Sequence, residues 1–568
     1  MDNQRLLLFL ALSLVVLFIW EAWQERNIPQ PVLVESEQQN TPRSAITDGA
    51  LPEMPMDGAP EIALSESQNL ATPKLPEREQ ANEKQAQIKL QQGKRLRVVT
   101  DVLDLDIDTV GGDIRRAFFP IYPISADKPD EPFPFMNDRL PRFFIAQSGL
   151  LSSADAPDHR AIYQAEKAEY ILNAAENVLI VPLTWTSPSG LKVTKTFTFK
   201  RGDYLVSINH IIENKTGKLW QGRQYGQFQR TEYDEPGKSR LLYTFSGGAV
   251  STPESPYEKI DFDEMAEWKP EQSYTTNGWI AMLQHYFVSA WVPSTQNSAN
   301  HFYTRATSDQ RYILGMTEEQ RSVESGAIEE FRTQLYIGPK DQDILEKIAP
   351  NLELTVDYGF LYIIAKPLFW LLQQIHSLVG NWGWAIIFLT FLIKLIFYKL
   401  SEASYRSMAN MRKLAPKFQS IRERYGDDRQ RMSQAMMEIY KKEKVNPMSG
   451  CWPMLVQIPV FISLYWVLLE SVELRQADFM LWITDLSSKD PFYVLPLLMG
   501  ASMYVQQKLS ANPSLDPMHQ KIMQFLPLIF TLFFMLFPAG LVLYWVVNNI
   551  LSITQQWYIT RKIENATK

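Results

Sequence analysis

Two polar side chains that could bind a partner lie inside one apolar segment of the carboxy-terminal half. Lys394 lies about two-thirds along the apolar segment 382–400, and Thr390 lies one helical turn earlier on the same face. A cation at the centre of a bilayer costs about 2.5–3.5 kcal/mol on insertion scales, so such a residue usually has a function. The lysine could instead extend its amine to the membrane surface beside Lys399. Position alone leaves both interpretations open.

Polar side chains also occur in other apolar segments. They are Gln457, Ser463, Thr531, Asn548, Asn549, Thr554 and Gln555. Any one of them could simply hydrogen-bond a neighbouring helix. Together with Lys394 they predict a hydrophilic groove that opens to the cytoplasm, with Thr390, Gln457 and Asn548 in its polar lining. An apolar wall is predicted beside it from Ile529, Phe530, Leu532, Phe533, Phe534 and Leu536.

The rest of the sequence offers no machinery for catalysis. There is no GxxxxGK[ST] phosphate loop and no GxSxG nucleophile motif, and the six histidines are scattered without metal-ligand spacing. Cys451 is the only cysteine, which excludes an intramolecular disulfide and a cysteine-rich metal site. A net charge of -7 argues against direct nucleic-acid binding. We therefore expect no catalytic residue, no metal and no cofactor.

The groove residues require membrane-spanning helices to position them. Five apolar segments between residues 381 and 560 predict five spans, at 382–400, 454–469, 492–508, 522–537 and 541–557. A sixth apolar segment, 6–23, predicts an uncleaved anchor within residues 1–26. A signal peptide would need small residues where Trp20 and Trp23 stand, which favours the anchor.

Loop charge predicts the orientation. The segment 399–444 carries twelve Lys or Arg and six Asp or Glu, whereas 470–491 carries two basic and five acidic residues. The positive-inside rule places the first loop in the cytoplasm and the second outside. With six spans, both termini and the tail 561–568 are cytoplasmic, and the large middle domain is periplasmic.

The middle of the chain predicts a tether followed by a β domain. Residues 27–94 contain eight prolines and no aromatic residue, so they predict a disordered periplasmic tether. Apolar and polar residues then alternate, as in Leu103, Leu105 and Ile107, and a Ser187-Pro188-Ser189-Gly190 turn separates two further strands. An antiparallel β-sandwich is expected over 95–350. Its tryptophans could form a ligand-stacking platform, although tryptophan in such domains is more often core.

Two further helical units are expected at the membrane. Within 351–380, Leu371, Leu372, Ile375, Leu378 and Val379 share one face, which predicts an amphipathic helix lying in the interface. Residues 401–447 predict a cytoplasmic helical hairpin with its turn near Gly426. Its methionine-rich stripes could bury against each other or form an adaptable surface for clients, a targeting factor or the ribosome.

Several long motifs in the last third resemble the YidC/Oxa/Alb family of membrane protein insertases. They are Glu443-Lys444-Val445-Asn446-Pro447, Gly450-Cys451, Gln457-Ile458-Pro459-Val460-Phe461, Val472-Glu473-Leu474-Arg475-Gln476-Ala477, and Phe537-Pro538-Ala539-Gly540-Leu541-Val542-Leu543-Tyr544. The resemblance is strong over about 355–560. The amino-terminal half is similar to the Gram-negative type, whose periplasmic domain is a β-supersandwich.

The resemblance implies how such a protein works. A hydrophilic groove, closed to the periplasm, receives the polar tail of a client. The client's apolar segment meanwhile moves along an apolar surface of the protein, which we call the slide. The family's groove arginine falls on Lys394, which keeps the charge and loses the bidentate geometry. Slide positions that contact clients fall on Phe461, Met499, Phe533, Tyr544 and Trp545. The implied partners are nascent membrane proteins and the Sec translocon with its accessory subunits.

These observations together predict a non-enzymatic insertase and chaperone of the inner membrane, which acts alone or with the Sec translocon. Two alternatives from other classes are a polytopic transporter with a small-solute cavity and a membrane-anchored periplasmic binding module.

Overall fold

The computed structural model describes residues 90–233, 244–270, 274–293, 299–426, 428–443, 452–510 and 517–565. The chain divides into two compact units, 1–46 and 47–568, and all described residues belong to the second. The expected anchor at 1–26 and all but the end of the expected tether at 27–94 lie outside the described residues.

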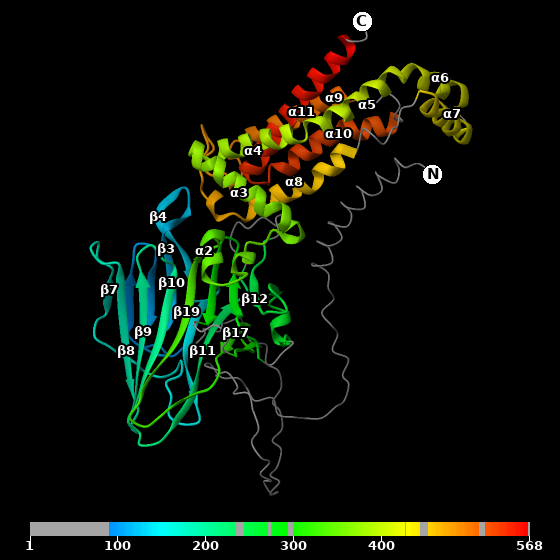
Figure 1. The fold of residues 1–568 in the computed structure, drawn as a ribbon. Helices are drawn as coiled ribbons and strands as arrows, with labels where there is room; N and C mark the ends of the chain where they lie inside the picture. Colours follow the sequence, from blue (N-terminus) through cyan, green and yellow to red (C-terminus); the bar gives the residue numbers. More distant parts are fainter. Residues whose placement is uncertain are drawn as a thin grey trace, which may run out of the picture. The chain divides into compact units, whose positions relative to one another are not determined.

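The first half of the described chain forms two β-sheets (Figure 1). One has ten strands, in the order β16-β17-β11-β5-β3-β2-β1-β7, with β18 beside β11 and β4 beside β3. The other has nine strands, in the order β13-β12-β14-β15-β19-β10-β9-β8-β6. The strands are β1 Arg95–Val99, β2 Asp104–Asp108, β3 Asp113–Ser125, β4 Lys128–Met136, β5 Phe144–Ser152, β6 Gln164–Ala165, β7 Glu169–Ile171, β8 Val178–Thr186, β9 Leu191–Lys200, β10 Leu205–Asn214, β11 Trp220–Thr231, β12 Gly247–Ser251, β13 Glu258–Ile260, β14 Trp279–Leu283, β15 Phe287–Pro293, β16 His301–Ala306, β17 Arg311–Thr317, β18 Arg321–Val323 and β19 Ile328–Pro339.

Alternating side chains explain the long strands. In β9 every second residue from Leu191 to Phe199 is buried, and the residues between them are half-buried, because successive side chains point to opposite faces. The predicted turn Ser187–Gly190 joins β8 to β9, and Gly190 has a φ of +99°, a conformation that suits glycine. The expectation of β-sandwich sheets is confirmed.

One strand pair departs from the expected antiparallel arrangement. Strand β1 pairs with β2 in the antiparallel sense and with β7 in the parallel sense, so that Arg97, Val98 and Val99 lie opposite Glu169, Tyr170 and Ile171. A parallel pair requires a long connection, here the chain from β2 to β6, and such a pairing leaves no turn signal between the two strands. The prediction of a wholly antiparallel sandwich was therefore wrong at this edge.

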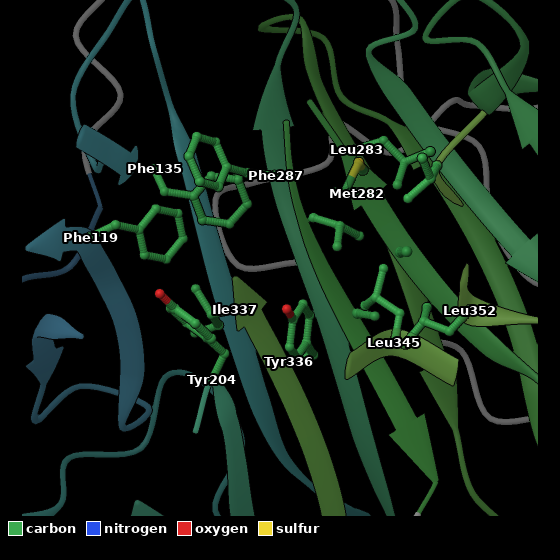
Figure 2. Packing of buried hydrophobic residues seen from close by; sticks show 14 of the residues in the cluster. Phe119, Phe135, Tyr204, Met282, Leu283, Phe287, Tyr336, Ile337, Leu345 and Leu352 are labelled. Carbon is green, nitrogen blue, oxygen red and sulfur yellow. The ribbon is translucent and has the colours of Figure 1, made fainter. Parts of the chain in front are cut away.

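Aromatic rings fill much of the space between the sheets. Figure 2 shows Phe119, Phe135 and Phe287 grouped together, with Tyr204 and Ile337 nearby. The ring of Phe119 lies 5.2 Å from that of Phe135 and 4.8 Å from that of Phe287. Three of the tryptophans considered for a stacking platform belong to the core: Trp220, Trp279 and Trp291 are fully buried and cannot stack on a ligand. The other two, Trp185 and Trp268, are half-buried.

A buried lysine joins the two sheets. Lys195 of β9 extends its amine to the opposite sheet, where it donates to the carbonyl oxygens of Gly111 and Ser148 at 2.8 and 2.9 Å. Burial lowers the pKa of Lys195 and raises that of nearby Asp113, while the attraction between the two charges opposes both shifts. Asp113 also accepts a hydrogen bond from Gln147. The core thus contains an ion-containing polar layer as well as hydrocarbon.

The second half is helical (Figure 1). Its α-helices are α2 Gln342–Ile348, α3 Tyr362–Val379, α4 Trp382–Ile396, α5 Tyr398–Lys413, α6 Ala415–Tyr425, α7 Arg429–Lys442, α8 Trp452–Glu470, α9 Val494–Ser510, α10 Pro517–Phe534 and α11 Ala539–Asn565. Among the described residues no single helix is long and apolar enough to cross a membrane, but α4 and residues 398–411 of α5 are together, with a bend of 66° between them.

Helix α3 occupies the segment expected to be amphipathic, and it packs against α4 and α8. Its buried residues are Ala365, Phe369 and Leu372, whereas Leu378 of the predicted apolar stripe is exposed. The helix ends at Gly380, in the left-handed conformation. Leu378 lies in the last turn of the helix, where none of the described residues covers it.

The segment expected as a two-helix hairpin contains three helices. A break at Leu414 divides its first helix into α5 and α6, and α7 follows after a turn. Phe418 of α6 and Tyr440 of α7 lie with their ring centroids 5.2 Å apart, and Lys417 forms an ion pair with Glu443. The stripes of α6 and α7 therefore meet each other at least in part.

The buried carboxyl group of Glu318, at the end of β17, generates a prediction about pH. Burial raises its pKa to about 8, although Arg321 opposes the shift. In the unfolded chain it titrates near 4.5, so unfolding releases a proton between about pH 4.5 and pH 8, and stability falls as pH rises through that window. Glu318→Gln should remove this loss and raise the free energy of unfolding above pH 8 by roughly 2–4 kcal/mol.

The measurement is thermal unfolding of the purified full-length chain at a series of pH values. Glu319→Gln, at the exposed neighbouring residue, is the control and should follow the parent. Parallel curves for Glu318→Gln and the parent would contradict the prediction.

Candidate functional site

The predicted groove lysine lies at a junction of two helices. The Nζ of Lys394, on α4, donates to the Oγ of Ser552, on α11, at 2.8 Å. Ser552 in turn donates to the carbonyl oxygen of Asn548 at 2.7 Å, and Tyr405 of α5 is a further hydrogen-bond partner of the same serine. Lys394 is half-buried and Ser552 is buried. The amine is therefore held between helices rather than extended along one of them.

The other predicted lining residues surround this junction to different extents. Asn548 joins it through its backbone carbonyl, and its side chain is half-buried. Gln457 of α8 donates to the Oγ of Ser401 on α5 at 3.5 Å. Thr390 is buried, and its hydroxyl donates to the carbonyl oxygen of Ile386 in its own helix. The structure connects Lys394 to the backbone of Asn548 through Ser552, whereas the hydroxyl of Thr390 bonds a carbonyl oxygen of its own helix.

Several polar residues that form hydrogen bonds between helices were not predicted from the sequence. Ser552 is the most important, and α9 contributes Ser502, which accepts from Asn549 at 3.0 Å, and Ser510, which donates to Gln556 at 3.2 Å. A lone serine in an apolar segment is a weak signal because its hydroxyl can bond the carbonyl one turn earlier. The spacing of three and four residues from Trp545 through Asn548 to Ser552 could have identified one face of α11.

An aromatic cluster joins α8, α10 and α11. Phe461 lies 5.7 Å from Tyr544 and 4.6 Å from Trp545, measured between ring centroids. Trp545 lies 4.7 Å from Phe534, and Phe533 packs against Phe534 at 5.8 Å. Four of the five predicted slide residues thus belong to one cluster.

One face of α10 is exposed and apolar. It consists of Phe525, Leu528, Ile529, Leu532 and Phe533, with Leu536 just beyond the helix. Phe530 and Phe534, which the sequence placed in the same wall, contact Trp545 instead. Helical periodicity explains the division, because the exposed and inward residues lie on different faces of one helix.

The slide residues differ in exposure. Phe533 is 42% exposed, Phe461 and Trp545 are half-buried, and Tyr544 is 5% exposed. Met499 is fully buried within α9. In this arrangement of the helices, a client could reach Phe533 directly, but it could reach Met499 only after the helices separate.

The chemistry available here is attraction, hydrogen bonding and apolar contact. Within the described ranges, no group of three or more His, Cys, Asp or Glu residues could hold a metal ion. Lys394 and Ser552 supply a cation and hydroxyl on the face of α11 that also carries Trp545, and that aromatic side chain contacts α10. A polar site and an apolar surface therefore share one helix.

Comparisons with known proteins cover nearly the whole chain. The YidC periplasmic domain family matches residues 95–371, and the 60Kd inner membrane protein family matches residues 374–566. A membrane protein insertase YidC of Thioalkalivibrio sulfidiphilus is 49% identical, with 100% of both chains covered. That of Nitrosococcus oceani is 50% identical, with 99% of each covered. A solved structure of an active YidC insertase has a TM-score of 0.38 and 17% identity, and covers 83% of this chain and 93% of that one.

The family matches and these relatives define an inner-membrane protein of the membrane protein insertase class. More particularly, the chain belongs to the YidC family of membrane protein insertases, the type with a periplasmic β domain. The full-length matches support neither the transporter nor the periplasmic binding module as its function.

Removal of the Ser552 hydroxyl tests whether the junction stabilises the helices. Ser552→Ala leaves the half-buried amine of Lys394 without this acceptor, so we expect the free energy of unfolding to fall by about 1.5–3 kcal/mol. The measurement is denaturant unfolding of the purified chain in detergent micelles. Thr554→Ala removes an exposed hydroxyl from the same helix and should change stability by less than about 0.5 kcal/mol. Equal effects of the two substitutions would contradict the assignment.

Proposed function

We propose that the chain inserts clients by holding their polar tail near Lys394 while their apolar segment moves along α10 and the aromatic cluster. The observation that carries the proposal is the hydrogen bond between Lys394 and Ser552. It keeps a cation among apolar helices, on the same face of α11 that presents Trp545 to α10. The tail and the apolar segment of one client can therefore contact neighbouring parts of α11.

Charge is the proposed basis of tail recognition. An ion pair at 4 Å contributes about 1 kcal/mol in bulk water and about 4 kcal/mol at an effective dielectric of 20. One half-buried cation is therefore sufficient to attract an acidic tail into a partly dehydrated groove. Thr390, Gln457 and Asn548 supply the polar lining in this mechanism, although the hydroxyl of Thr390 must leave the carbonyl oxygen of Ile386 to take part.

Burial of apolar surface is the proposed driving force. Transfer of a client's apolar side chains into lipid is favourable by about 25 cal/mol per Å². The exposed face of α10, with Phe533 in it, offers a surface of the same character as the lipid. Phe461, Tyr544 and Trp545 line the proposed slide behind that face, and Met499 becomes available only if α9 moves.

The proposed orientation follows from the charges. The hairpin 401–447, the tail 561–568 and both termini are cytoplasmic, the β domain is periplasmic, and α3 lies in the interface. The anchor 1–26 and five spans in 381–560 make six crossings in this proposal. The Sec translocon as partner of the chain, and a targeting factor or the ribosome as partner of the hairpin, stay predictions.

Substitution of Lys394 tests the groove charge. If attraction is what matters, Lys394→Arg should insert clients at nearly the parental rate, whereas Lys394→Ala and especially Lys394→Glu should slow acidic-tailed clients, by about tenfold for Lys394→Glu. The measurement is the insertion rate into liposomes of paired clients that differ only in an acidic or neutral tail. Lys399→Ala, which removes an exposed lysine beyond the end of α4, is the matched control.

A lysine that only extends to the membrane surface predicts a different result. Lys394→Ala would then be harmless, because Lys399 still marks the end of the helix. Equal insertion of both clients by Lys394→Glu and by the parent would refute the groove-charge mechanism.

Limited proteolysis tests the orientation. Protease added outside spheroplasts should cut the tether 27–94 and leave the hairpin 401–447 intact, because the tether is expected in the periplasm and the hairpin in the cytoplasm. Disruption of the membrane should then expose the hairpin to cleavage, which serves as the control. Cleavage of the hairpin in intact spheroplasts would reverse the proposed orientation.

A further inference from the structure

Two adjacent glutamines of α11 have opposite surroundings. The Nε2 of Gln556 donates to the carbonyl oxygen of Leu509, on α9, at 3.1 Å, and its Oε1 accepts from Ser510 at 3.2 Å. Gln555 is half-buried as a whole, but the nitrogen and the oxygen of its side chain are both buried, and neither has a hydrogen-bond partner among the described residues. One glutamine therefore joins two helices, whereas the other keeps a complete amide group unused.

An unused amide inside a helical bundle is unfavourable. A buried donor or acceptor without a partner has lost its hydrogen bonds to water and gained none in return, so nearly all buried polar groups in proteins are paired. In helices α3 to α11, Gln555 is the only described residue with buried side-chain polar atoms that lack a hydrogen bond. The packing of α11 at rest gives this amide no use, which favours a partner that arrives from outside the protein.

Gln555 belongs to the face of α11 that carries the proposed groove. Asn548, Ser552 and Gln555 are separated by four and three residues, so they follow one another along one side of the helix. Ser552 in this row accepts the hydrogen bond from Lys394 at 2.8 Å. Gln555 lies about one turn closer to the carboxy-terminal end of α11, which is the cytoplasmic end in the proposed orientation. A tail that enters from the cytoplasm would therefore pass Gln555 before it reaches Lys394.

We propose that Gln555 binds a peptide group of the client's polar tail, so that the groove recognises the backbone of a polypeptide as well as its charge. A side-chain amide has N–H donors and a carbonyl acceptor, which complement the carbonyl and N–H groups of a peptide backbone. Nearly every residue of a tail offers these groups, so the contact is independent of the tail's sequence, whereas Lys394 favours acidic tails. The inference rests on the proposed function, because it requires the tail to enter the groove.

Gln555→Leu separates this role from a structural one. Leucine has a similar volume and removes the unused amide, so the variant in detergent micelles should unfold at a denaturant concentration no lower than that of the parent. Insertion of a short single-span client into liposomes should nevertheless slow about fivefold, as expected for the loss of one neutral hydrogen bond. Clients with acidic and with neutral tails should be slowed equally.

Gln556→Leu is the matched control, because it makes the same chemical change at the next residue. It removes the hydrogen bonds to Leu509 and Ser510, so it should unfold at a lower denaturant concentration than the parent. A structural role for Gln555 would lower the unfolding midpoint of Gln555→Leu in the same way. That result, or insertion by Gln555→Leu at the parental rate, would overturn the proposal.

Clients with a single backbone ester test the peptide group directly. An ester replaces one N–H group of the tail by oxygen and leaves every side chain and the tail charge unchanged. At the position that Gln555 contacts, the ester should slow insertion by the parent and have no further effect on insertion by Gln555→Leu. A series of esters that slows the two proteins equally at every position would also overturn the proposal.

The ester series and the Lys394 series give independent answers. If the Lys394 variants insert acidic-tailed and neutral-tailed clients alike, the groove-charge mechanism fails, and an ester effect that depends on Gln555 still supports the backbone contact. If the Lys394 variants respond to tail charge and the esters show no dependence on Gln555, the charge mechanism stands and the backbone contact is refuted.

Discussion

The hydrogen bond between Lys394 and Ser552 sets the main constraint on the helical half of the molecule. An ammonium group among apolar side chains must find an acceptor, and here the hydroxyl of Ser552, on another helix, is that acceptor. Ser552 can serve only if α11 lies beside α4 at the correct height. The packing of α11 against α4, α5 and α9, and the bonds of Asn549 and Gln556 to α9, keep it there.

The fold was predictable where the signal is local. The alternation at Leu105 and Ile107 falls in β2, and Leu103 directly precedes that strand; the turn at Gly190 lies where its residue types require. The parallel pairing of β1 with β7 was not predictable, because the two strands are far apart in sequence and their alternation fits either direction. The same limit affects the helices, where composition identifies an apolar segment but cannot show that Met499 faces inward and Phe533 outward.

The kind of groove could be predicted from the sequence, but not all of the residues that form it. A lysine within an apolar segment is costly enough to stand out, but its partner is a single serine 158 residues away in the chain. Arg475 illustrates the opposite case. It belonged to a recognisable motif, yet nothing in the sequence joined it to Pro123, because hydrogen bonds to backbone carbonyls leave no residue-type signal in the partner.

The lysine that bridges the two β-sheets has a consequence for how the domain avoids misfolding. Lys195 reaches two particular carbonyl oxygens, of Gly111 and Ser148, and a sandwich whose sheets are displaced by one residue pair would turn its ammonium toward hydrocarbon. Such an error costs several kcal/mol, whereas an apolar side chain at the same position would tolerate it. Lys195 thus contributes little to the stability of the native packing of the two sheets. Its main effect is to make the displaced packings less stable.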